Sequence, residues 1–271
     1  MLAEVANYAN DAAAVEKSLR LLQALVQIAA GTTSSAADAK TWSTARGHFA
    51  LARRFLRLFK WIDFSQLTLQ SWSSEQDSSR RILKTSKNAL LGLYFFMEMF
   101  CIVNAMGITA SPFLNALQHH ALQVWFFAIS VSLLLTFYDF LTIRSVTSSP
   151  TTKTQLSTSL LLDACDILIP GSAVGWISAS SVTVGIASSI SSVIAGKQIW
   201  NRVQKESREM QARRKERMSR KVRFGAGTKA SDDEKEEMME AEKKGSNSVV
   251  NGSVKAVENE VYGVKRRSKK A

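Results

Sequence analysis

The chain has 271 residues, of which 46% are hydrophobic and 21% are charged, and its formal net charge is +12. This composition excludes a wholly disordered chain, and two cysteines exclude a small disulfide-stapled domain. Residues 197–271 carry 21 of the 35 basic side chains, whereas only six charged residues lie between Asn88 and Gly196. An ordinary soluble domain is therefore excluded as well, and a membrane-embedded middle is predicted.

Residues 4–30 are predicted to form the first helix. Its apolar residues recur at alternating spacings of four and three, which places them on one face. We expect this face to pack against a neighbouring helix. Gly31 and the Ser/Thr cluster that follows it end the pattern. The apolar face consists of Tyr8, Ala12, Val15, Leu19, Leu22, Val26 and Ala29.

The second predicted helix runs from Asp38 to about Phe64 and has two faces. At about 100° per residue, its arginines fall on one side and its large apolar residues on the other. Such a helix is typical of a membrane surface or a partner groove, and a solvated face over a protein core is the alternative. We predict membrane binding by Arg46, Leu51, Arg53, Arg54, Phe55, Arg57, Leu58, Phe59, Lys60 and Ile62.

Two apolar stretches follow a polar loop at 71–79 and a basic step at Arg80–Lys87. Ala89–Ala110 carries a single charge, Glu98, and is long enough to cross a hydrocarbon layer of ~30 Å. A carboxylate facing lipid is costly, so Glu98 should pack inward or lie near the interface. The second stretch is Ala121–Tyr138.

A third apolar region follows residues 145–159, which are rich in Ser and Thr and are predicted to form a loop. Pro170-Gly171 is expected to break the chain, and Ile167–Gly196 carries no charge. Small residues recur along this segment at spacings of three or four, which lets helices approach closely in lipid. We predict that this face mediates helix–helix packing and self-association. Its residues are Ser181, Gly185, Ser189, Ser192 and Gly196.

The C-terminal region alternates between basic and acidic blocks without apolar periodicity, which is typical of a disordered tail. Basic residues flank the apolar middle at Arg80–Lys87 and at Lys197–Arg223, and both flanks are expected on the cytosolic side. The number of crossings should then be even, two or four. The chain is thus predicted to be an all-α integral membrane protein. Its parts are amphipathic helices (1–70), a membrane-embedded helical region (80–200) and a charged tail (201–271).

The sequence contains no phosphate-binding glycine loop, no Ser-His-Asp order and no HExxH or CxxC motif. Asp163 and Asp166 could mimic a catalytic carboxylate pair, but inward-facing or interfacial aspartates are the more plausible interpretation. We therefore expect no enzyme activity, no catalytic residues, no cofactor and no metal. Nucleic-acid binding is not expected either, because the basic tail lacks interleaved aromatic residues.

Four segments are informative together, and they are Val15–Gln23, Ala52–Lys60, Leu161–Asp163 and Val184–Ile190. In their order and spacing they resemble the peroxin eleven family of peroxisome-proliferating membrane proteins. The resemblance covers about residues 5–200. Phe59 stands where the family usually has Gly, and the tail beyond Arg202 is longer than usual. These departures suggest a divergent paralogue, with a fungal origin as one interpretation.

The resemblance implies a peroxisomal membrane protein with both termini in the cytosol. Members of the family elongate the membrane before fission, associate with themselves, and work with a dynamin-related GTPase and its tail-anchored adaptor. The family's membrane-bending helix corresponds to Trp42–Phe64 here. Anionic membrane lipid is the expected partner of its arginines.

Two alternatives to membrane remodelling remain open at this stage. A pore or metabolite carrier is favoured by carboxylates at membrane depth. A scaffold is favoured by the long charged tail, 203–271, which could recruit a partner. The carboxylates in question are Glu98, Asp139, Asp163 and Asp166.

Overall fold

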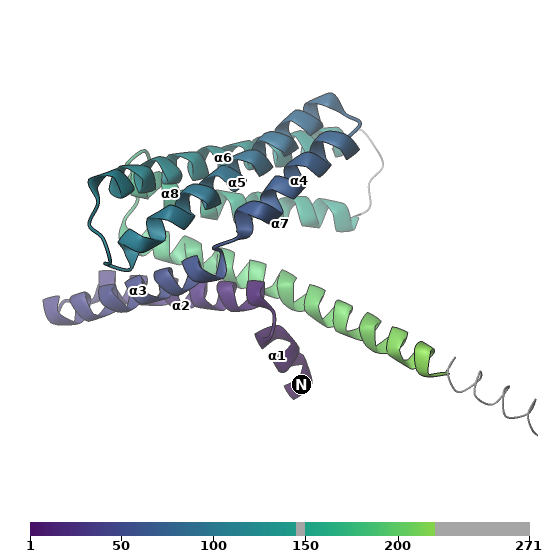
Figure 1. The fold of residues 1–271 in the computed structure, drawn as a ribbon, viewed down its shortest axis with the longest axis horizontal. Helices are drawn as coiled ribbons and strands as arrows, with labels where there is room; N and C mark the ends of the chain where they lie inside the picture. The colour runs from purple at the N-terminus through teal and green to yellow at the C-terminus, as the bar shows by residue number, and fades with distance from the viewer. Residues whose placement is uncertain (145–149, 220–271) are drawn as a thin grey trace, which may run out of the picture. The chain divides into compact units, whose positions relative to one another are not determined.

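A computed structural model describes residues 1–144 and 150–219, and all its regular elements are α-helices, as the sequence predicted. The chain divides into two units, Met1–Glu206 and Ser207–Ala271; in the second, residues 207–219 are helical. The labelled helices are α1 (Leu2–Ala9), α2 (Ala12–Thr32), α3 (Ala36–Leu56), α4 (Lys60–Ser74), α5 (Ser78–Ala105), α6 (Pro112–Arg144), α7 (Pro150–Asp166) and α8 (Leu168–Val174) (Figure 1). A long helix, Ser181–Ser219, follows them.

The predicted helix 4–30 is in fact two helices that meet at Asn10 and Asp11. The Asp11 side chain accepts a hydrogen bond from the backbone N–H of Ala14 at 2.9 Å. This bond satisfies a donor that has no partner within the first turn of α2. A strong N-cap in mid-pattern therefore starts a new helix although the apolar spacing continues.

The predicted helix 38–64 is also divided, because α3 ends at Leu56 and α4 begins at Lys60. At this corner the N–H groups of Arg57 and Leu58 bond to carbonyls three residues back, at 3.1 and 3.3 Å. Such tight bonds are typical of a helix end. Helix α4 then continues to Ser74, so most of the predicted loop 71–79 is helical.

Helices α5 and α6 form an antiparallel pair with α4 packed against α5. Their shared core contains Tyr94 and Phe95 from α5 and Ala121 from α6. The Tyr94 ring stacks on Trp125 with centroids 5.2 Å apart, and Phe95 stacks on Phe64 of α4 at 5.3 Å. These aromatic contacts fix α4 and α6 on two sides of α5.

Two sequence boundaries in the C-terminal half were wrong. Residues 150–159 belong to α7 rather than to a loop, and Pro170-Gly171 lies inside α8. Pro170 is tolerated there because backbone N–H groups in the first turn of a helix have no intrahelical acceptor, so the N–H that proline lacks costs no hydrogen bond. The break comes instead at Gly175, whose φ of 86° suits glycine.

The long helix Ser181–Ser219 extends past residue 201, where the predicted tail begins. Lysine, arginine and glutamate are good helix formers, so charge does not stop a helix once it has started. The rest of the predicted tail, 220–271, lies outside the described residues.

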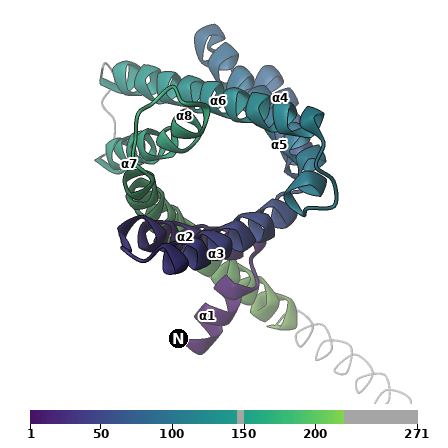
Figure 2. The same cartoon turned by 90° about the vertical axis from the view of Figure 1, so that its left-hand side faces the viewer.

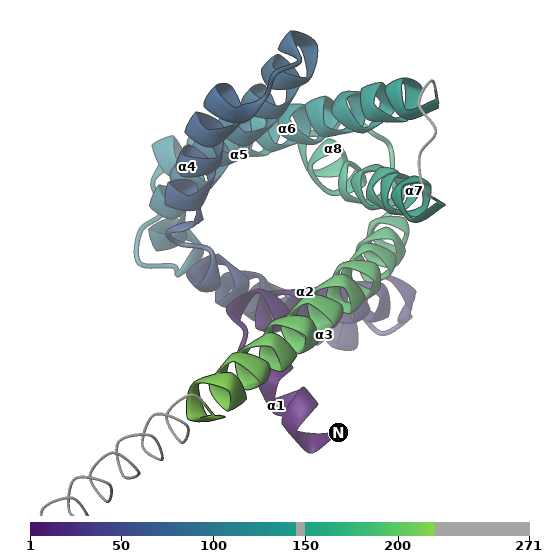
Figure 3. The same cartoon turned by 90° about the vertical axis from the view of Figure 1, so that its right-hand side faces the viewer.

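Four helical stretches are long and apolar enough to cross a membrane: Ser78–Ala105, Pro112–Thr142, Lys153–Val174 and Ser181–Ser219. Viewed from two opposite sides, the helices of residues 12–206 surround a common centre, and α1 projects away from it (Figures 2 and 3). Helices α2 and α3 lie on one side of this centre, and α5 and α6 lie opposite. The side chains that face this centre form the candidate site.

Candidate functional site

Helix α2 buries two charged side chains beside two alanines and exposes two of its leucines. Glu16 is 2% exposed and Arg20 is buried, whereas Leu22 and Leu25 are exposed, the latter by 49%. The prediction that the apolar face packs against a neighbouring helix is wrong for Ala12 and Leu22, which are exposed. The inversion is physically reasonable in a lipid environment, where an outer apolar face is favourable and inward polar groups need partners.

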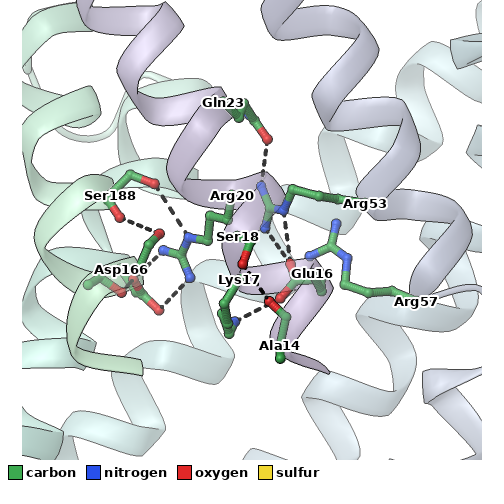
Figure 4. A network of polar contacts seen from close by, with 12 residues as sticks. Ala14, Glu16, Lys17, Ser18, Arg20, Gln23, Arg53, Arg57, Asp166 and Ser188 are labelled. Carbon is green, nitrogen blue, oxygen red and sulfur yellow. Dashed lines mark hydrogen bonds and ion pairs between the residues drawn. The ribbon is translucent and has the colours of Figure 1, made fainter. Parts of the chain in front are cut away.

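The first polar cluster joins α2 to α3 through Arg53 (Figure 4). The Arg53 guanidinium contacts Glu16 Oε1 at 2.8 Å and donates to Gln23 Oε1 at 2.6 Å. Lys17 Nζ lies 3.0 Å from the other oxygen of Glu16. Burial alone would raise the pKa of Glu16, but the charges of Lys17, Arg53 and Arg57 outweigh it and hold this pKa well below its ordinary value.

The second cluster joins α2 to α7 and to the long helix (Figure 4). Both terminal nitrogens of Arg20 contact the carboxylate of Asp166, one of them at 3.2 Å. Arg20 Nε also donates to the Ser188 hydroxyl at 3.4 Å, and Ser191 donates to Asp166. One buried guanidinium thus ties three helices together.

The third cluster surrounds Glu98 on α5. Its Oε1 lies 3.0 Å from Arg57 Nη2 and 3.6 Å from Arg54 Nε, and it accepts a hydrogen bond from the Tyr94 hydroxyl at 2.9 Å. Glu98 therefore packs inward, which is one of the two placements expected from its cost in lipid.

The other carboxylates at membrane depth also have partners. Asp163 accepts a hydrogen bond from Ser132 at 2.6 Å, and Asp139 lies 3.0 Å from Arg80. Asp163 and Asp166 each bind residues of different helices, so they do not form a carboxylate pair with one shared function.

A cavity of about 260 Å³ lies between these clusters. Its charged lining consists of three arginines of α3 (Arg46, Arg53 and Arg54), Arg57 at the C-cap of α3, and one carboxylate, Glu98. Gln23, Gln27 and Gln118 add amide groups, and Leu122, Trp125 and Ile169 add an apolar wall. Chemically, this lining favours an anion.

The residues predicted to bind the membrane divide between the inside and the outside of the bundle. Arg53, Arg54 and Arg57 face the interior clusters, because Glu16 and Glu98 offer them buried carboxylates. The structure does not place these three guanidinium groups on an outer surface. Phe55, Phe59 and Ile62 are exposed, as is Arg46, whereas Leu51, Leu58 and Lys60 are half-buried. Membrane binding by these residues stays a prediction.

The small residues of the long helix pack against the chain's own N-terminal helices. A Cβ at Gly185 would lie 2.7 Å from Ile28 Cγ1, and one at Gly196 would lie 3.3 Å from the Tyr8 hydroxyl. The Ser181 carbonyl accepts a hydrogen bond from Gln27 at 2.9 Å, Ser192 is buried and Ser189 is half-buried. Close helix packing occurs at this face, and its partners within the chain are α1 and α2. Self-association stays a prediction.

Sequence reasoning missed Glu16, Arg20 and Gln118 as interior residues. It placed Glu16 and Arg20 away from the packing face, although their i, i+4 spacing on one helix face was visible. Gln118 had no sequence signal of its own.

The family comparison agrees with the resemblance in the sequence. The family model described as Peroxisomal biogenesis factor 11 (PEX11) matches residues 2–200. The chain belongs to the PEX11 family. It is therefore a peroxisome biogenesis factor of the peroxisomal membrane, and the PEX11 family is not a known enzyme family. No curated protein and no solved structure gave a significant match to the chain.

The part of the chain that matches the PEX11 family contains all three polar clusters and every residue that lines the cavity. It ends at residue 200, within the long helix. The site thus lies in the region that this chain shares with the family.

Proposed function

We propose that this PEX11 protein elongates the peroxisomal membrane by inserting the corner between α3 and α4 into one leaflet. The observation that carries the proposal is the exposure of large apolar side chains at this corner. Phe55 is 49% exposed, Phe59 is 64% exposed and Ile62 is 40% exposed. An apolar wedge in one leaflet expands that leaflet and favours curvature.

The size of the wedge is sufficient for membrane attachment. Full burial of one large apolar side chain is worth about 1.5–3 kcal/mol, so three half-exposed ones contribute several kcal/mol between them. The interior ion pairs of Arg53 and Arg57 fix the rotation of α3, which keeps Phe55 on the outside. In this proposal the arginines orient the wedge rather than bind headgroups.

Two further parts of the proposal come from the family resemblance and from charge. Both termini are expected in the cytosol, with four crossings made by the four long apolar helices. Self-association and cooperation with a dynamin-related GTPase and its tail-anchored adaptor are expected from the family. The scaffold hypothesis concerns 203–271, most of which lies outside the described residues.

The wedge is tested by a matched pair of double variants. Phe55→Ser with Phe59→Ser removes apolar surface at the corner, and Leu22→Ser with Leu25→Ser removes exposed apolar surface from α2. We expect the corner variant to lose peroxisome elongation in cells and tubulation of anionic liposomes, while the α2 variant retains both. Equal loss in both variants, or normal elongation with the corner variant, would refute insertion at this corner.

A second candidate function is a pore or carrier, and the polar cavity favours it. The cavity is lined in part by helices that could cross a membrane, and polar surface between such helices is typical of solute pathways. If the cavity conducts solutes, liposomes containing the purified protein should leak small anions without changing shape. Ala50 lines the cavity, so Ala50→Phe would fill part of the cavity and should stop this flux. Flux that is unchanged by Ala50→Phe would exclude the cavity as the pathway.

A further inference from the structure

We propose that the arginine-lined cavity binds a phosphate group, carried either by a lipid headgroup or by a small soluble compound. The proposal concerns the cavity alone and does not depend on insertion of the α3–α4 corner. It rests on three observations: an excess of positive charge, buried polar atoms without partners, and the size and lining of the cavity.

The cavity has more cations than the carboxylates of the described residues neutralise. Arg54 and Arg57 share one oxygen of Glu98, which is the single carboxylate in the lining. Arg53 is paired with Glu16, but Glu16 also contacts Lys17. Arg46 has no ion pair within the described part of the chain. A bound anion would offset this excess in a site where water screens charge poorly.

Two polar atoms of the lining are buried without a hydrogen-bond partner, Arg57 Nε and Gln118 Oε1. Buried polar atoms are normally paired, so each such atom needs an explanation. A phosphate oxygen would accept from Arg57 Nε. The Gln118 amide also carries an NH₂ group, and a flip of the amide would place this donor where the oxygen now lies, facing the same ligand.

Phosphate suits the lining better than a carboxylate or a halide does. Guanidinium groups present parallel N–H donors that match phosphate oxygens two at a time, and several arginines converge here from one helix. A volume of about 260 Å³ is below the ~300–1,000 Å³ of sites for drug-sized ligands, so it suits a phosphate group with a short attachment. The apolar wall of Leu122, Trp125 and Ile169 would contact that attachment.

Arg46 is the position that tests the site without disturbing the fold, because it lines the cavity, is exposed and has no ion pair. Lys40 provides the control, since it is an exposed cation on the same helix that does not line the cavity. Full-length protein in detergent and a phosphate-free buffer would be titrated with pyrophosphate in a calorimeter. Its thermal unfolding would be measured at each pyrophosphate concentration, with the ionic strength held constant. We expect saturable binding and stabilisation, about tenfold weaker in Arg46→Gln and unchanged in Lys40→Gln.

The two sources of phosphate are separated in nanodiscs of phosphatidylcholine with or without phosphatidic acid. Saturable pyrophosphate binding in phosphatidylcholine alone would indicate a soluble ligand. Native mass spectrometry would show whether phosphatidic acid stays bound to the purified protein. Bound lipid that is lost in Arg46→Gln and kept in Lys40→Gln would indicate a lipid headgroup.

The proposal fails if neither pyrophosphate nor phosphatidic acid binding depends on Arg46. The corner variant with Phe55→Ser and Phe59→Ser should bind pyrophosphate normally, so loss of the wedge and loss of the anion site give different results.

Discussion

Arg57, the C-cap of α3, and Glu98 of α5 are 41 residues apart in the chain, yet the Nη2 and Oε1 atoms of this pair lie 3.0 Å apart. The pair joins an amphipathic helix to the first long apolar helix. Both side chains are largely buried, so removing either one would leave the other as an uncompensated buried charge. The ion pair therefore fixes which side of α3 faces the bundle.

Removing one member of this pair should be costly. Glu98→Gln leaves Arg54 and Arg57 without a carboxylate, and we expect a loss of about 3–5 kcal/mol in the free energy of unfolding in detergent. Arg202→Gln removes an exposed pair with Asp11 and should cost less than about 1 kcal/mol. Denaturant unfolding measures both variants. Similar small losses would mean that the buried pair is not what holds α3 in place.

Replacing either of two glycines by alanine should change the stability of the protein, in opposite directions. A Cβ at Gly185 would lie 2.7 Å from Ile28 and 3.2 Å from the Ala24 carbonyl, whereas one at Gly47 meets nothing within 4 Å. We expect Gly185→Ala to lower stability by about 1–3 kcal/mol through crowding of α2. Gly47→Ala should raise stability by about 0.5–1 kcal/mol, because it lies inside a helix.

The same Gly185 variant separates packing within the chain from self-association. Chemical crosslinking in the membrane reports the oligomer, and thermal unfolding reports the monomer. Loss of crosslinked oligomer with unchanged monomer stability would place a second copy, rather than α2, against Gly185.

The stability of the protein should rise with pH between about pH 8 and pH 10.5 through Lys17. Burial lowers the pKa of Lys17 from 10.5 to about 8. In this window the unfolded chain binds a proton that the folded chain does not, so raising the pH favours the folded state. Lys17→Met should remove this part of the slope, and Lys40→Met, at an exposed position, should not. A slope that survives Lys17→Met would assign it to another group.

Membrane topology is predicted from the two basic flanks, Arg80–Lys87 and Lys197–Arg223. Tags at the two ends of the chain should both be digested by protease added to intact peroxisomes. A tag inside the peroxisome should stay protected and serves as the control. Protection of one end alone would require an odd number of crossings.

The helices themselves were predictable because their causes are local. Apolar spacing and charge depletion within short windows were sufficient to predict the all-α class and long apolar helices. The helix boundaries were less predictable, because single caps decided them. Asp11 starts α2 in the middle of a continuous apolar pattern, and Pro170 is accommodated in the first turn of α8.

The inward and outward faces of α2 and α3 were decided by the tertiary structure alone. A hydrophobic pattern determines that two faces differ, but it does not determine which face is inside, because water and lipid favour opposite choices. The side chain of Arg53 points inward because Glu16, 37 residues away, is buried beside it. Arg57 does the same because of Glu98. Partners this distant leave no trace in local periodicity, so only the fold brings the arginines together around the cavity and leaves Phe55 and Phe59 on the outside.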